Sequence, residues 1–401
     1  PQIPSTWNLG EGFDLFMKSS HLPFHVMAKP TGAICNLDCA YCFFLSKEKL
    51  YPGSDFRMSD EVLKEYIKQY VQSQPTPEVT ITWQGGEPTL MGLDFFEKAT
   101  KYANEFKQRR QRVSFAIQTN GVLLDDDWGK FLRKNRYLVG ISIDGTEPLH
   151  DTYRRDKGNK PTFKSVIAGL DILKKYRIET NILCTVNAVN GGHPLEVYRF
   201  FRDELQAAYI QFIPVVEREG DGVTERSLRP KQWGDFLTAI FDEWVRRDVG
   251  KVFIPTFESA LANFYGVPAG ICVFNETCGS ALALEHNGDL YACDHYVDPN
   301  YLLGNIAQSP MSELVASEKQ QTFGKAKKDD LPQYCRDCDV RFACHGECPK
   351  NRFVKTPDGE AGLNYLCEGY KAFFRHIDAP MKFMANELRM QRSPARVMTH
   401  F

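Results

Sequence analysis

Three cysteines near the amino end of the chain have the spacing of a metal-cluster loop. Cys35, Cys39 and Cys42 form a Cys-x3-Cys-x2-Cys run that directly follows the apolar stretch 24–27. Three thiolates can hold three irons of a [4Fe–4S] cube and leave the fourth iron open to another ligand, unlike a closed site of four cysteines. The spacing therefore predicts an iron centre that can carry out chemistry, with a zinc knuckle as the alternative.

A second group of cysteines lies in the last third of the chain and is large enough for two sites of four ligands. On spacing alone, a double zinc ribbon would use the same number. A further cysteine, Cys184, falls in a predicted strand, where a free thiol usually packs in the core. The group consists of Cys272, Cys278, Cys293, Cys335, Cys338, Cys344, Cys348 and Cys367.

Segments with the patterns of strands and helices alternate through the first 247 residues. Strict alternation indicates an α/β fold with a parallel sheet and right-handed crossovers. Six strands are too few for an eightfold barrel, so we predict a partial (β/α)6 TIM-like barrel, with an open doubly wound sheet as the alternative. Strands are expected at 24–28, 79–83, 113–119, 137–143, 180–186 and 209–215, and helices at 59–71, 93–106, 126–133, 163–176, 194–205 and 231–247.

Polar and glycine-rich motifs follow the first four predicted strands. The cysteine run follows the first strand, 84–88 the second and 119–121 the third, and Asp144 ends the fourth. Two glycines in 84–88 let the main chain approach a ligand, although Gly-Gly before Pro is also an ordinary turn. Because ligands collect at the carboxyl ends of parallel strands, these motifs predict one active site.

The cysteine run and the Gly-Gly-Glu-Pro motif together resemble the radical S-adenosylmethionine (SAM) enzymes. In that superfamily three cysteines bind a [4Fe–4S] cluster, and SAM takes the open iron. The resemblance implies that Gln84, Gly85, Gly86 and Glu87 hold the methionine amino group of SAM. It also implies ribose contacts from Ser142 and Asp144, adenine packing by Phe43 and a carboxylate contact from Arg154.

The cysteine-rich last third resembles the SPASM extension of radical SAM enzymes, which carries two auxiliary [4Fe–4S] clusters. The resemblance implies interleaved ligand sets. Cys272, Cys278, Cys293 and Cys348 would bind one cluster, and Cys335, Cys338, Cys344 and Cys367 the other. Full ligation by cysteine would leave these clusters to transfer electrons or to stabilise the fold, because neither would have an open iron.

Four longer motifs are similar to those of anaerobic sulfatase-maturating enzymes: residues 83–90, 118–121, 288–296 and 303–305. This resemblance implies oxidation of a cysteine or serine in a sulfatase polypeptide, in an unfolded or nascent segment, to Cα-formylglycine without oxygen. A 5′-deoxyadenosyl radical would abstract the β-hydrogen. Asp294, which follows Cys293, would be the base that accepts the remaining proton. A flavodoxin-like or ferredoxin-like protein would supply electrons.

Composition narrows the class of protein. The 49 Lys and Arg residues nearly balance the 51 Asp and Glu residues, so charge indicates neither a nucleic-acid partner nor an anionic membrane surface. No apolar run is long enough to span a membrane, and the amino-terminal pattern is not that of an export signal. Cysteines clustered at ligand spacing favour a reducing compartment, so we expect a cytoplasmic protein.

The sequence leaves several interpretations open. We expect a radical SAM barrel at 1–247, a SPASM domain at 248–378 and a helical tail at 379–401. Within the superfamily, the alternative function is a maturase that forms a crosslink in a ribosomal peptide. In a different class, the alternative is a zinc-ribbon binding or scaffold protein with an inactive barrel.

Overall fold

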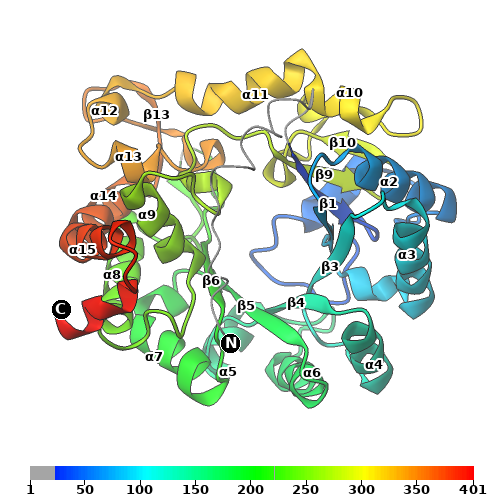
Figure 1. Ribbon diagram of the computed structural model, residues 1–401, viewed down its shortest axis with the longest axis horizontal. Helices are drawn as coiled ribbons and strands as arrows, with labels where there is room; N and C mark the ends of the chain where they lie inside the picture. Colours follow the sequence, from blue (N-terminus) through cyan, green and yellow to red (C-terminus); the bar gives the residue numbers. More distant parts are fainter. Residues whose placement is uncertain (1–22, 221) are drawn as a thin grey trace.

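A sheet of parallel and antiparallel strands forms the centre of the molecule (Figure 1). The computed structural model describes residues 23–220 and 222–401. In these residues the main sheet has nine strands, in the order β11-β10-β9-β1-β2-β3-β4-β5-β6. The six strands that come first in the chain are parallel to one another. They are His25–Lys29 (β1), Glu78–Trp83 (β2), Arg112–Thr119 (β3), Tyr137–Ser142 (β4), Glu179–Val186 (β5) and Ile210–Pro214 (β6).

The strands β1 to β6 follow one another in chain order, which distinguishes a partial barrel from a doubly wound sheet. A doubly wound sheet reverses its strand order at a switch point, whereas this order never reverses. The prediction of a partial (β/α)6 barrel is confirmed, and the helices surround the arc of strands (Figure 1). They are Asp60–Ser73 (α2), Leu93–Phe106 (α3), Asp126–Lys134 (α4), Glu147–Tyr153 (α5), Phe163–Lys175 (α6), Pro194–Arg199 (α7) and Pro230–Arg247 (α8).

The core lies between the sheet and these helices. Along β2, Val79, Ile81 and Trp83 are buried in alternation, as expected of one face of a strand. The ring of Trp83 meets Phe96 of α3 edge-on, with 5.7 Å between centroids. Burial of each such side chain contributes about 2–3 kcal/mol, so the packing of helices against the sheet fixes the strands that carry the site.

Two local features differ from the predictions. Helix α5 was not predicted, because its seven residues are too few for a clear helical period. The expected helix at 194–205 is an α-helix only to Arg199 and continues as the π-helical turn Phe200–Glu204. The loop after β6 contains the short strands Arg218–Glu219 (β7) and Gly222–Val223 (β8).

The last third of the chain extends the barrel sheet beyond β1. Strand β9 (Ala281–Glu285) pairs in parallel with β1, and β10 (Asp289–Tyr291) and β11 (Leu302–Asn305) follow in antiparallel order. One sheet therefore crosses the boundary that we expected at residues 247 and 248. The other elements are Pro255–Tyr265 (α9), Met311–Ala316 (α10), Glu318–Asp329 (α11), Gln333–Arg336 (α12), Arg341–Cys344 (α13), Val354–Lys355 (β12), Ala361–Leu363 (β13), Cys367–His376 (α14) and Asp378–Arg389 (α15).

The same segment also packs against the far end of the arc, where α14 crosses α8 (Figure 1). At this crossing Gly234 meets Gly369, and a Cβ atom on Gly369 would lie 2.1 Å from the carbonyl oxygen of Pro230. Only glycine permits so close an approach of two helices. Beside them, Trp233 and Tyr370 pack edge-on at 6.1 Å. The C-terminal segment thus joins both ends of the open barrel.

Candidate active site

The four motifs predicted to form a site lie at one edge of the sheet. The three-cysteine loop follows β1, Gly85 and Gly86 follow β2, Asn120 follows β3 and Asp144 follows β4. These strands are parallel, so their carboxyl ends share that edge.

The three thiols of the first loop are partly buried and close enough to influence one another electrostatically. Burial raises the pKa of Cys35 to about 12 and that of Cys39 to about 11. Such thiols lose their protons only to strong positive charge, which iron would supply. The amide of Leu37 donates to Cys35 Sγ at 3.3 Å, a contact suited to a thiolate that binds metal.

Gly85 and Gly86 pack directly on this cysteine loop. The amide of Gly86 donates to the carbonyl of Gly32 at 2.8 Å, and the amide of Glu87 donates to the carbonyl of Ile34 at 2.9 Å. A Cβ atom on Gly86 would lie 2.0 Å from the Ile34 oxygen, and Gly85 has a φ of +131°. Both positions therefore require glycine, and the motif holds the cysteine loop in place.

The carboxylate of Glu87 binds the protein itself. It accepts hydrogen bonds from Thr89 N and Oγ1 at 3.1 and 2.6 Å, from Thr119 Oγ1 at 2.7 Å and from Asn120 N at 2.8 Å. The side chain is 1% exposed. Glu87 thus ties the loop after β2 to the loop after β3.

Asp144 and Arg154 form a buried ion pair beneath the cysteine loop. Arg154 Nε lies 3.0 Å from Asp144 Oδ2, and the hydroxyl of Tyr41 donates to the same oxygen. The other oxygen accepts from the amide of Thr185 at 2.9 Å. Burial raises the pKa of Cys39, and the charge of Arg154 opposes that rise. The two predicted SAM contacts are therefore neighbours, and both are engaged with protein groups.

The remaining predicted SAM contacts occupy two places. Ser142 Oγ accepts from Gln118 Nε2 at 3.0 Å, at the end of β4. Phe43 is 40% exposed and lies beside the C-terminal segment. Its ring centroid is 5.6 Å from that of His295 and 4.9 Å from Lys350 Nζ. The aromatic residue after the third cysteine thus faces the SPASM side.

Asp294 reaches the barrel from the C-terminal segment. It begins the 3-10 turn Asp294–Tyr296 after β10, is 7% exposed and pairs with Lys29 at the end of β1. Burial opposes ionisation, but the charge of Lys29, its hydrogen bond to the carboxylate and the charge of Lys350 prevail and lower the pKa of Asp294. Its carboxylate is therefore ionised at neutral pH and able to accept a proton.

The eight C-terminal cysteines lie in two groups. In the first group, the thiols of Cys278, Cys293 and Cys348 all interact electrostatically with Cys272. Burial raises the pKa of Cys293 to about 12. The second group lines one cavity: Cys335, Cys338, Cys344 and Cys367.

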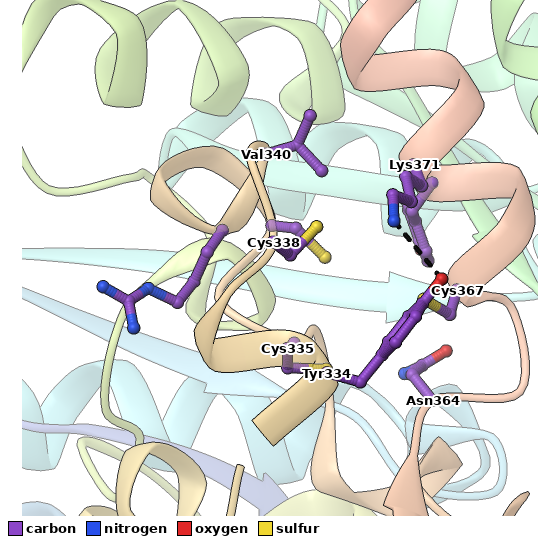
Figure 2. Close-up of a pocket in the computed structure, with 11 residues that line it drawn as sticks. Tyr334, Cys335, Cys338, Val340, Asn364, Cys367 and Lys371 are labelled. Carbon is purple, nitrogen blue, oxygen red and sulfur yellow. Dashed lines mark hydrogen bonds between the residues drawn. The ribbon is translucent and has the colours of Figure 1, made fainter. Parts of the chain in front are cut away.

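Figure 2 shows the cavity that the second group of cysteines lines, with Cys335, Cys338 and Cys367 around a common space. Lys371 and Tyr334 lie at its rim, where Lys371 Nζ donates to the Tyr334 hydroxyl at 3.2 Å. Burial raises the pKa of Cys344, so these thiols also need positive charge to ionise. Four thiols around one small cavity fit a cluster ligated entirely by cysteine.

One buried cation, Lys327, and one half-buried cation, Arg352, hold the loops that carry these cysteines. Lys327 Nζ donates to the carbonyls of Cys272, Val273 and Asn275 at 2.6, 2.9 and 2.6 Å. Arg352 donates to the Lys327 carbonyl at 2.6 Å and influences thiols of both groups. Fixed positive charge here favours the thiolate form that metal ligation requires.

In residues 23–220 and 222–401, no group of three or more His, Cys, Asp or Glu is placed to hold one metal ion. Cys184 lies apart in β5 and is fully buried.

Comparison with known proteins identifies the family. The model of the radical SAM superfamily matches residues 30–201, and that of the SPASM iron–sulfur cluster-binding domain matches residues 272–339. A serine-type anaerobic sulfatase-maturating enzyme of Bacteroides thetaiotaomicron is 46% identical, and the match covers 94% of each chain. The chain belongs to the family of anaerobic sulfatase-maturating enzymes. A cysteine-type relative from Clostridium perfringens is 34% identical over 92% of this chain and the whole of its own.

Solved structures agree with this family. The structure titled native anSMEcpe with bound AdoMet and Cp18Cys peptide has a TM-score of 0.83 and 33% identity, and covers 92% of this chain and all of its own. Streptococcus suis SuiB with bound S-adenosylmethionine is 14% identical at a TM-score of 0.59, which shows the fold alone. Family membership replaces the zinc-scaffold interpretation.

Sequence reasoning missed two residues of this family member's site. Lys29 ends an apolar strand, and Tyr41 lies between two cysteines, yet both are fully or nearly fully buried beside carboxylates. A lysine at the end of a buried strand was the available signal, since lysine is almost never fully buried unless it is paired.

In the part of the chain that the structure describes, no helix is long and apolar enough to cross a membrane.

A buried histidine makes the stability of this site depend on pH. The Asp144 amide lies 3.3 Å from His150 Nδ1, and burial lowers the pKa of His150 to about 4. The unfolded chain binds this proton near pH 6.5, so stability is lost as pH falls toward 4. We expect the residue to reduce the free energy of unfolding by about 2 kcal/mol between pH 7.5 and pH 5.

Denaturant unfolding at the two pH values measures this effect. His150→Gln should flatten the dependence, whereas His193→Gln, at an exposed histidine, should leave it as in the parent. An unchanged slope in His150→Gln would contradict the assignment.

Proposed function

We propose that this enzyme oxidises a serine or cysteine side chain of a sulfatase polypeptide to Cα-formylglycine without oxygen. The observation that carries the proposal is the position of Asp294. It pairs with Lys29 on the strand that leads into the three-cysteine loop, in a chain similar over 94% of its length to a serine-type enzyme. Its relatives include both serine-type and cysteine-type enzymes, so both side chains are candidate substrates.

The cofactors are three [4Fe–4S] clusters and SAM. When bound together, SAM and the first cluster supply a carbon-centred radical that can take hydrogen from an unactivated carbon. We assign Cys35, Cys39 and Cys42 to the first cluster and the two groups of four cysteines to the auxiliary clusters. The proposed SAM contacts are Phe43, Gln84, Gly85, Gly86, Glu87, Ser142, Asp144 and Arg154.

Asp294 supplies the proton acceptor for the second half of the oxidation. Conversion of an alcohol or thiol to a carbonyl or thiocarbonyl removes two hydrogens. The first leaves the β-carbon as a hydrogen atom, and the second leaves as a proton and an electron; an auxiliary cluster would accept that electron. A buried, ionised carboxylate within hydrogen-bond reach of the substrate Oγ or Sγ takes that proton.

The proposed compartment and electron donor follow from the need of the clusters for reduced thiols and for electrons. We place the enzyme in the reducing cytoplasm, where thiols remain available for metal. A flavodoxin-like or ferredoxin-like protein is the proposed electron donor, and the balanced charge of the chain offers no support for a nucleic-acid partner. We keep the division into a barrel at 1–247, a SPASM domain at 248–378 and a tail at 379–401. Of the first segment, residues 1–22 lie outside the described residues.

A peptide assay tests the function. The anaerobically reconstituted enzyme, SAM and a reductant should convert sulfatase-derived peptides to formylglycine, with loss of two hydrogens from the serine form and loss of sulfur from the cysteine form. Mass spectrometry measures the products, and chromatography measures 5′-deoxyadenosine. A crosslinked peptide that retains its sulfur, or no deoxyadenosine at all, would contradict the proposal.

Asp294→Asn tests the proposed base. An amide cannot accept the proton, so formylglycine formation should fall by about 100-fold or more while iron content is retained. Asp298→Asn is the matched control, because asparagine can still accept the Asn300 amide that Asp298 caps. Turnover of Asp294→Asn at the rate of the control would remove the assignment.

Cys344→Ala and Cys184→Ala test the cysteine assignment. Loss of one ligand should prevent a cluster from binding to the second group of cysteines. Iron and sulfide in Cys344→Ala should therefore fall by about a third of the total for three clusters. The same change at Cys184, buried in β5 away from both groups, should leave both contents as in the parent. Equal metal content in the two variants would contradict the assignment.

A further inference from the structure

Lys29 is enclosed at the point where the two parts of the chain meet. It ends β1 and has no exposed surface. Its Nζ donates to Asp294 Oδ1 and to Gln84 Oε1, the latter at 3.0 Å, and lies 4.3 Å from the ring centroid of Phe44. One ammonium group therefore contacts three segments: the loop after β1, the loop after β2 and the turn after β10.

Such an arrangement is costly unless every partner is in place. Burial removes the hydration of the ammonium group, and the two oxygens and the aromatic face replace it. Gln84 fixes where the ammonium lies, and the ammonium fixes one oxygen of Asp294. In the described residues, Asp294 Oδ2 receives no hydrogen bond, and the side chain keeps 9% of its surface exposed.

We propose that Lys29 is a positioning residue for the oxidation: it anchors Asp294 Oδ1, so that Oδ2 is the oxygen that takes the substrate proton. The inference rests on the proposed function. It also gives Gln84 a role toward Lys29 that is separate from the contact with SAM. Because Lys29 acts through Asp294, its loss should affect the second half of the oxidation more than the first hydrogen abstraction.

The test compares Lys29→Met, Lys29→Arg and Lys29→Met/Asp294→Asn with the parent and with Asp294→Asn. The readouts are deoxyadenosine released per formylglycine formed, the KM for the peptide and iron content. In Lys29→Met we expect the ratio to rise about tenfold or more, as for loss of an oriented acid–base group. The peptide KM should change less than kcat, and Lys29→Arg, which keeps the charge, should recover much of the coupling.

Lys175→Met is the control, since Lys175 is an exposed lysine of α6 that pairs with Asp126 of α4, away from the cysteine loops. There, deoxyadenosine, formylglycine and their ratio should all stay as in the parent. The double variant should have the ratio of Asp294→Asn alone, because residues that act as one unit are not additive.

Three outcomes overturn the inference. A parental ratio in Lys29→Met, with both products reduced in parallel, would make Lys29 purely structural while the proposed function stands. Additive effects in the double variant would separate Lys29 from Asp294. If the parent itself forms no formylglycine from either peptide, the proposed function fails and the role of Lys29 fails with it.

Discussion

The pairing of β9 with β1 is the interaction on which the rest of the site depends. Strand β1 leads into the three-cysteine loop and has β2 along its other edge. Because β9 adds to the free edge, the following hairpin brings Asp294 to Lys29, the last residue of β1. A domain packed loosely against the barrel would leave that distance variable, whereas backbone hydrogen bonds in one sheet fix it.

Buried charge is the common feature of this edge of the sheet. Glu87, Asp144 and Asp294 are almost fully enclosed, and each carboxylate has several donors or a cationic partner. Burial of such groups adds little to stability, because the loss of hydration offsets the pairing. Its benefit is orientation: dipoles and charges fixed before a ligand arrives need not reorganise during the reaction.

The cysteines show the same coupling of fold and chemistry. Burial raises the pKa of most of these thiols, so without a cation the low dielectric favours the protonated form. Clusters would supply the missing charge and link segments that lie far apart in the sequence, such as 272 and 348. Metal binding and folding of the C-terminal segment are expected to be linked, as in other small metal-bound domains.

The sequence predicted what depends on local pattern. Apolar and β-branched runs gave six strands within one residue of their positions, and spacing marked the cysteines as candidate ligands, since both signals act over a few residues. The division of the later cysteines into two sets of four came from the family resemblance. The ion pairs of Lys29 with Asp294 and of Arg154 with Asp144, and the enclosure of Glu87, joined residues from different strands and could not be seen in any local pattern. The sequence by itself determined the barrel, its motifs and the chemistry of its cysteines. Only the tertiary structure decided that β9 pairs with β1. The two strands lie far apart in the sequence, and a pairing over such a distance produces no periodic pattern of residues from which it could be predicted.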